Sequence, residues 1–120
     1  MYEVEFYYDR NGKSDIVEYL DKLIKRGRTS KNERINRDKI LAYMIALKEH
    51  GTRIGEPMVK HIDGDIWELR PLDNRIFFFY WKDNKYVMLH HFIKKTNKTP
   101  SREIKTAQAK MKDYIERHGE

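Results

Sequence analysis

Four short strand-like runs between residues 58 and 94 place the tightest constraint on how this chain folds. The runs are rich in β-branched and aromatic residues and are separated by compact turns, of which Asp63-Gly64 and Asp83-Asn84 are the clearest. We expect these strands near 58–62, 65–70, 75–82 and 85–94. Because such turns join neighbouring strands directly, the pattern predicts a four-stranded antiparallel meander.

Two helices are predicted before the meander. Ser14 is suited to cap a helix that ends near Gly27, since apolar residues recur between them at helical spacing. Ser30 and Glu33 form a capping-box pattern, and the helix that follows ends at Gly51. We therefore expect a helical hairpin.

The two ends of the chain complete the fold. Residues 2–8 alternate mostly apolar with acidic side chains, which predicts one N-terminal strand. Near the other end, Thr99 is a candidate cap and Pro100 a candidate first residue of a last helix. The 120 residues thus predict a single α+β domain, 1–120, with the order strand, helical hairpin, four strands, helix.

Turn lengths also predict which side chains share a face of the sheet. They pair His61 with Ile66, Glu68 with Phe77, Phe77 with His90 and Arg75 with Phe92. One face would then be apolar and would pack on the helical hairpin, with Ile62, Trp67, Leu69, Ile76, Phe78, Tyr80, Val87, Leu89 and Ile93. The other face would be open and would hold His61, Glu68, Arg70, Arg75, His90 and Lys94 among the aromatics Phe77, Phe79, Trp81, Tyr86 and Phe92.

The charged groups of the open face suit cleavage of RNA without a metal ion. That reaction needs a base for the 2′-hydroxyl, cations for the phosphate and an acid for the leaving 5′-oxygen. Arginine matches phosphate through its planar fork of donors, and exposed aromatics can stack on unpaired bases. In the competing interpretation, Glu68 and Arg70 form a surface ion pair and the aromatics are a second core under the C-terminal helix.

The net charge of +6 is concentrated in one segment. Residues 94–112 contain seven basic side chains against the single acid Glu103, and the rest of the chain is neutral. An excess of positive charge beside the proposed catalytic face indicates a polyanionic partner, nucleic acid before a membrane surface. A solvated helix face also explains Lys105, Lys110 and Lys112.

Other chemistries have little support in the sequence. The chain has no cysteine, and its five histidines show no metal-ligand spacing, so we predict no metal and no cofactor. His91 is expected to be a structural histidine on the core face. No apolar run approaches the roughly 20 residues of a membrane span, and the start has no secretory leader pattern, so a cytoplasmic location is expected.

Three segments resemble a known family. They are Ile66-Trp67-Glu68-Leu69-Arg70, then Arg75 through Tyr80, then His90 through Thr96 continuing to Lys98-Thr99-Pro100. Together they are similar to the phage-derived, HigB-like branch of the RelE/ParE toxin superfamily. The resemblance implies a type II toxin that cuts messenger RNA, usually on the ribosome. It also implies a cognate helix-turn-helix antitoxin of the HigA kind, through which alone the toxin would meet operator DNA.

The resemblance also suggests roles for single residues. Arg75 matches the family's arginine at the scissile phosphate, Arg70 matches a second basic position, and Lys94 or Lys95 matches a late basic residue. With Glu68 and His90 as the proton-transfer groups, the predicted catalytic set is Glu68, Arg70, Arg75, His90 and Lys94. The predicted RNA-binding set is His61, Lys95, Lys98, Arg102, Phe77 and Phe92.

Two further functions stay open from the sequence. Relatives on the same fold poison DNA gyrase by contact, without cutting RNA, and a nucleic-acid-binding phage accessory protein would need only the basic segment. The sequence does not say which of Glu68 and His90 is base and which is acid. Codon preference, ribosome dependence, the site of the antitoxin and the oligomeric state of the complex are equally open.

Overall fold

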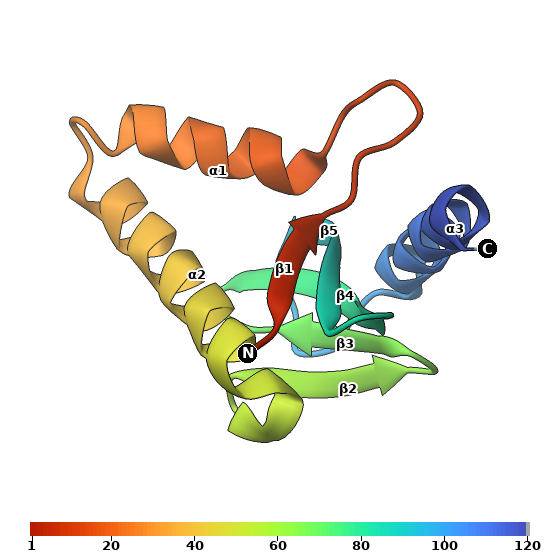
Figure 1. The fold of residues 1–120 in the computed structure, drawn as a ribbon. Coiled ribbons are helices and arrows are strands. Elements are labelled where there is room, and N and C mark those ends of the chain that lie inside the picture. Colours follow the sequence, from red (N-terminus) through yellow and green to blue (C-terminus); the bar gives the residue numbers. More distant parts are fainter. Residues whose placement is uncertain (120) are drawn as a thin grey trace.

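The computed structural model describes residues 1–119, which form one five-stranded sheet with helices on both faces (Figure 1). The elements in chain order are β1 (Glu3–Phe6), α1 (Asp15–Arg26), α2 (Lys31–His50), the 3-10 turn η1 (Gly51–Ile54), β2 (Val59–Asp63), β3 (Ile66–Leu69), β4 (Asn74–Trp81), β5 (Lys85–Ile93) and α3 (Ser101–His118). The predicted α+β class and order of elements are confirmed.

The sheet has the strand order β1-β5-β4-β3-β2. The pairs β2–β3, β3–β4 and β4–β5 are antiparallel, which confirms the meander. β1 lies parallel to β5 at the edge of the sheet, with Val4 beside Tyr86, and this pairing was not predicted. The chain between β1 and β5, which includes the helical hairpin and β2 to β4, supplies the long connection that a parallel pair requires.

The starts of the first two helices follow the predicted capping. The Ser14 hydroxyl accepts a hydrogen bond from the Val17 amide, and the Ser30 hydroxyl accepts one from the Glu33 amide. The last helix differs from the prediction. α3 begins at Ser101, Pro100 precedes it in an extended conformation, and no side chain caps this end, so Thr99 is not the cap. A proline before the first turn fixes the backbone that enters the helix.

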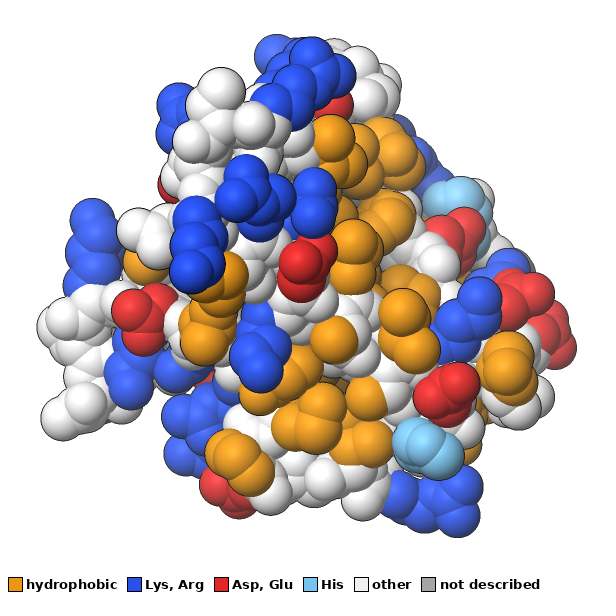
Figure 2. Space-filling view, turned by 90° about the vertical axis from the view of Figure 1, so that its left-hand side faces the viewer, with side chains coloured by type: hydrophobic (Ala, Val, Ile, Leu, Met, Phe, Trp, Pro, Cys, Tyr) orange, Lys and Arg blue, Asp and Glu red, His pale blue; other side chains and the backbone are white. Residues whose placement is uncertain are grey.

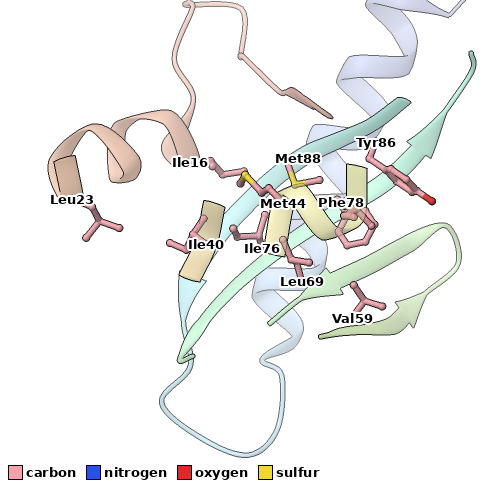
Figure 3. Packing of buried hydrophobic residues seen from close by; sticks show 11 residues of the cluster. Ile16, Leu23, Ile40, Met44, Val59, Leu69, Ile76, Phe78, Tyr86 and Met88 are labelled. Atoms are coloured by element: carbon pink, nitrogen blue, oxygen red, sulfur yellow. The ribbon is translucent and has the colours of Figure 1, made fainter. Parts of the chain in front are cut away.

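α1 and α2 cover one face of the sheet and bury the larger core. Ile16 and Leu23 of α1 and Ile40, Met44 and Leu47 of α2 contribute to it. Figure 3 shows Ile40 and Met44 of α2 beside side chains from the sheet, among them Ile76 and Met88. These residues repeat at helical spacing in the two helices, and the burial of apolar surface is what fixes the hairpin on the sheet.

α3 covers the opposite face, which the sequence analysis expected to be open. Phe77 and Phe79 of β4 are 0% and 2% exposed, packed near Ala107 and Tyr114 of α3. The expectation of an open aromatic face is therefore wrong, and the competing interpretation of a second core holds for these two rings. The cause is the apolar stripe of α3, which needs an apolar partner surface.

The predicted pairing of residues is correct for Glu68, Arg75 and His90, and it is wrong in parts of the β2–β3 and β4–β5 pairs. Glu68 pairs with Phe77, Phe77 with His90 and Arg75 with Phe92, as expected. A β-bulge after Phe77 then shifts the rest of the β4–β5 pair by one residue. A bulge adds one unpaired residue to a strand and redirects its side chains.

The bulge changes the faces on which several β5 side chains lie. Val87 and Leu89, expected under the hairpin, lie in the cluster with Tyr114 of α3. Tyr86, expected on the α3 side, lies in the hairpin core beside Phe78. Neighbouring residues of a regular strand point to opposite faces. At the bulge, however, Leu89 and His90 both lie on the α3 side.

The outer face of the hairpin carries apolar side chains that the core does not use. Figure 2 shows hydrophobic side chains gathered in a band on this side of the molecule, with Lys and Arg around it. Leu41 and Ile45 of α2 are exposed. Within residues 1–119, no helix combines the length and the apolar character needed to cross a membrane.

Candidate active site

A cleft of about 540 Å³ opens where β3 and β4 meet the segment between β5 and α3. Its floor comes from β2, β3 and β4, and its far wall from residues 92–103. The charged residues that line it are Lys60, Glu68, Arg70, Arg75, Lys94, Lys95, Lys98, Arg102 and Glu103. Seven of these nine carry positive charge, so the cleft suits an anionic ligand.

Glu68 lies at the floor between two arginines. Its Oε1 is 3.4 Å from Nε of Arg70 and 3.9 Å from Nε of Arg75, and the residue is only 2% exposed. The first contact is an ion pair without hydrogen-bond geometry. Among the described residues, neither Glu68 Oε2 nor Arg70 Nε has a hydrogen-bond partner, although both atoms are buried. An unpartnered donor such as Arg70 Nε can turn to an anionic ligand once its side chain adjusts.

Burial and charge act against each other in this pair. Burial raises the pKa of the Glu68 carboxyl above its ordinary value, although the nearby cations, Arg75 foremost, pull it down. Burial also lowers the pKa of the Arg75 guanidinium, with Glu68 opposing that shift. Each charge is therefore costly in this place unless the opposite charge lies beside it, and for Arg75 a phosphate could supply that opposite charge.

Arg75 is fixed by the backbone around it. Its Nη1 donates to the carbonyls of Leu72 at 2.7 Å and of Asn74 at 2.8 Å, and the side chain is 8% exposed. Leu72 has a positive φ of 59°, so the turn before β4 is shaped to direct its carbonyl toward this guanidinium. A guanidinium held in this way is oriented before a ligand arrives.

The basic wall is joined to the floor by the strand ends. The Lys94 amide donates to the Asp73 carbonyl at 2.8 Å, which places the start of the 94–100 segment beside the turn that precedes Arg75. Lys95 and Lys98 are exposed, and Phe92 is half-buried at the base of the wall. The structure thus brings most of the predicted site residues together: Glu68, Arg70, Arg75, Lys94, Lys95, Lys98, Arg102 and Phe92.

His90 lies behind the wall and does not line the cleft. Its Nε2 is 2.7 Å from Oε1 of Glu103, and its Nδ1 is 2.9 Å from Oδ2 of Asp15 and 3.1 Å from Nζ of Lys110. Lys110 also donates to Asp15 at 2.9 Å. Although burial raises the pKa of Asp15, the hydrogen bonds from His90 and Lys110 bring it below its ordinary value. These contacts occupy both ring nitrogens of His90 with protein groups.

Two predicted RNA-binding residues are placed elsewhere. Phe77 is 0% exposed beneath α3, so it cannot stack on a base. His61 pairs with Trp67 instead of Ile66, because a bulge lies between His61 and Asp63. Its ring packs against Trp67 on the hairpin side, away from the cleft. The prediction that Phe77 stacks on RNA is therefore wrong, and so is the expected place of His61 on the face that carries Glu68.

Sequence reasoning also missed residues of the cleft. Lys60, opposite Glu68 in the β2–β3 pair, takes the place expected for His61. Glu103 went unassigned, although its position as the single acid in the basic segment 94–112 was a usable signal. Lys110 also belongs to the contacts around His90 and is not simply a solvated residue of α3.

His91 differs from its neighbour in every contact. Its ring stacks on Tyr19 of α1 with centroids 3.9 Å apart, and its Nε2 lies 3.1 Å from the Asn74 side-chain oxygen. Burial lowers its pKa to about 4, so it is neutral at pH 7. The prediction of a structural histidine on the core face agrees with this environment.

In the described part of the chain, no group of three or more His, Cys, Asp or Glu side chains is arranged to hold a metal ion. The predicted independence from metals remains a prediction.

Comparison with known proteins places the chain in a family. Residues 18–112 match the family model described as phage-derived protein Gp49-like (DUF891). This match covers most of the chain, from α1 to α3, and includes every residue of the cleft. The chain therefore belongs to the Gp49-like family, which is part of the RelE/ParE-like toxin superfamily. Among curated proteins, none matches.

Proposed function

We propose that this protein is the toxin of a type II toxin-antitoxin system and that its cleft cleaves messenger RNA. One observation carries the proposal: Arg70 and Arg75 share the carboxylate of Glu68 at the floor of a cleft whose far wall is lined with lysines. Two guanidiniums and an ammonium within one cleft match the charge that develops on a phosphodiester during cleavage. Membership of the toxin superfamily supports the same function.

The reaction is an internal transfer of the phosphodiester. The 2′-hydroxyl loses its proton to a base, its oxygen attacks phosphorus, and the bond from phosphorus to the 5′-oxygen breaks. The 5′-oxygen takes a proton, which leaves a 2′,3′-cyclic phosphate and a 5′-hydroxyl. Arg70 and Arg75 bind the non-bridging oxygens, and Lys94 at the wall donates the proton to the leaving oxygen.

The limited set of RNA-binding groups in the cleft favours cleavage that depends on the ribosome. Lys95, Lys98 and Arg102 supply charge for the RNA backbone, and the half-buried Phe92 offers limited surface for stacking. Few groups in the cleft are suited to orient the 2′-oxygen in line with the bond that breaks. We propose that the ribosome presents the message in that geometry, as proximity and orientation demand.

A toxin with this activity needs a partner that restrains it. We propose a helix-turn-helix antitoxin encoded next to this protein, as the superfamily implies. An adjacent reading frame with that pattern would support the proposal, and co-expression should relieve growth arrest.

The proposal is tested with Arg70→Ala and Arg75→Ala in a translation system with programmed ribosomes. The wild-type protein should cut the message, and each variant should cut it about 100-fold more slowly or worse. Arg53→Ala on η1 is the matched control, because Arg53 is exposed and does not line the cleft. Growth arrest with intact messages and a DNA-damage response would indicate a gyrase poison instead.

A further inference from the structure

A chain of hydrogen bonds leads from the start of α1 to the wall of the cleft. It starts at Asp15 and Lys110, passes through both ring nitrogens of His90 and ends at Glu103. The three elements that supply it are α1, β5 and α3. Of the four side chains only Glu103 lines the cleft.

We propose that Glu103 is the base that accepts the 2′-hydroxyl proton, and that His90 and Asp15 are positioning residues behind it. The inference rests on the proposed function, since it assigns the proton acceptor of that same cleft. It also reassigns Glu68, which becomes the residue that positions the two arginines.

Exposure separates the two carboxylates of the cleft. The Glu103 side chain is 18% exposed, whereas that of Glu68 is 3% exposed and its unpartnered Oε2 is buried. A base must come within hydrogen-bond reach of the proton that it removes. Glu103 lines the wall with part of its side chain exposed, so a substrate can approach it, whereas the free oxygen of Glu68 is buried beside the two guanidiniums.

The contacts of Glu103 leave one oxygen for the substrate. Oε1 accepts from Nε2 of His90 at 2.7 Å, which fixes the plane of the carboxylate. Among residues 1–119, the one charged partner of Oε2 is Arg102, whose Nε lies 3.8 Å away and whose side chain is exposed. The proton therefore passes from the 2′-hydroxyl to Oε2, the 2′-oxygen bonds to phosphorus, and the 5′-oxygen leaves with a proton from Lys94.

Packing and polar contacts hold the His90 ring in its position behind the wall of the cleft. Its ring packs near Phe77 and Phe92, with centroids 6.5 Å and 6.2 Å away, and Asp15 and Lys110 contact its Nδ1. Asp15 follows the helix cap Ser14 directly, so its backbone is fixed by the start of α1. The contacts at Nδ1 hold the ring in place, and the ring in turn holds the Glu103 carboxylate at its other nitrogen.

The experiment measures single-turnover cleavage at saturating RNA on programmed ribosomes, with RNA affinity measured separately. Glu103→Gln should lower the rate constant by about 100-fold to 10,000-fold while the affinity changes less than about threefold. Glu103→Asp, which keeps the carboxylate, should restore part of the rate. Glu116→Gln, in the last turns of the same helix and exposed, is the matched control and should react as the wild type does.

The positioning role is tested with a double-mutant cycle. His90→Gln and Asp15→Asn should each lower the rate about tenfold or more, yet neither should slow the Glu103→Gln variant further, because both act through Glu103. Additive effects would show a general structural role and overturn the positioning role.

The failures are distinguishable. If Glu103→Gln cuts as fast as Glu116→Gln while Arg75→Ala is inactive, Glu103 is not the base and the proposed nuclease function stands. If Arg75→Ala also cuts normally, or if the wild-type protein does not cut at all, the proposed function itself is wrong and this inference falls with it.

Discussion

Nε2 of His90 lies 2.7 Å from Oε1 of Glu103, so the central histidine of β5 contacts the single acid of the basic segment 94–112. This contact joins α3 to the sheet immediately behind the cleft. It also explains why one acidic residue stands among seven basic ones: the carboxylate meets an imidazole on one side and the cleft on the other.

Replacing Glu68 should destabilise the protein. Glu68→Ala leaves Arg75 buried without its counter-charge, and breaking a buried ion pair from one side costs about 3 kcal/mol. The measurement is urea unfolding at pH 7, with Glu116→Ala as the exposed control. A decrease of less than about 1 kcal/mol would mean that Arg75 is stabilised by its backbone carbonyls alone.

His91 should make the stability depend on pH. Its pKa falls from 6.5 in the unfolded chain to about 4 in the folded protein, because burial disfavours its charged form. Stability from this group is thus complete above pH 6.5 and is lost as the pH falls toward 4, by about 3 kcal/mol at most. The titratable groups near it are Tyr19, on which its ring stacks, and Asp15, His90 and Glu103.

The comparison for that prediction is His91→Gln, which does not titrate and keeps a donor for Asn74. Urea unfolding at pH 7 and at pH 4.5 should show a smaller decrease in stability for this variant than for the wild type. The exposed His50→Gln should lose as much stability as the wild type does. Equal decreases for all three proteins would contradict a buried, neutral His91.

Tyr114 should contribute to the docking of α3. Its hydroxyl donates to Oε2 of Glu5 at 2.5 Å, and its ring is buried against Phe79 and Trp81. Tyr114→Phe keeps the ring and removes the hydrogen bond, so we expect the unfolding free energy to fall by about 1 to 2 kcal/mol. Tyr8→Phe, at an exposed tyrosine, should change the free energy by less than about 0.5 kcal/mol.

The exposed lysines of the wall should determine how RNA binding depends on salt. For single strands the slope of log affinity against log salt is about −0.7 per neutralised phosphate. Lys95→Ala combined with Lys98→Ala should therefore flatten the slope by about 0.7 for each phosphate that the variant no longer neutralises. Lys22→Ala with Lys39→Ala, on the helical hairpin, is the control of equal charge and should leave the slope unchanged.

Local signals in the sequence predicted the order of elements and the caps at Ser14 and Ser30. They also predicted the pairing of Glu68, Phe77 and His90. This pairing is regular because no bulge interrupts β3 and β4 on either side of their turn, or β5 from His90 to Ile93. The grouping of Arg70, Arg75 and Lys94 followed from that register. These features depend on residues close together in the chain.

The errors arose where distant parts of the chain decide the outcome. The bulge after Phe77 moved Val87 and Leu89 to the α3 side, and nothing in the local alternation marks it. The packing of α3 on Phe77 and Phe79 closed a face that was expected to be open. The contact between His90 and Glu103 depends on that packing, so the role of Glu103 was not visible from spacing alone.

The chemistry of the cut ends tests most directly whether the cleft cleaves RNA by internal attack. RNA cut by the wild-type protein on programmed ribosomes should carry a 2′,3′-cyclic phosphate, or the monophosphate it opens to, and a 5′-hydroxyl. Both ends should be missing with Arg70→Ala and Arg75→Ala. A 3′-hydroxyl with a 5′-phosphate, or a message left intact by the wild-type protein, would contradict the proposed nuclease.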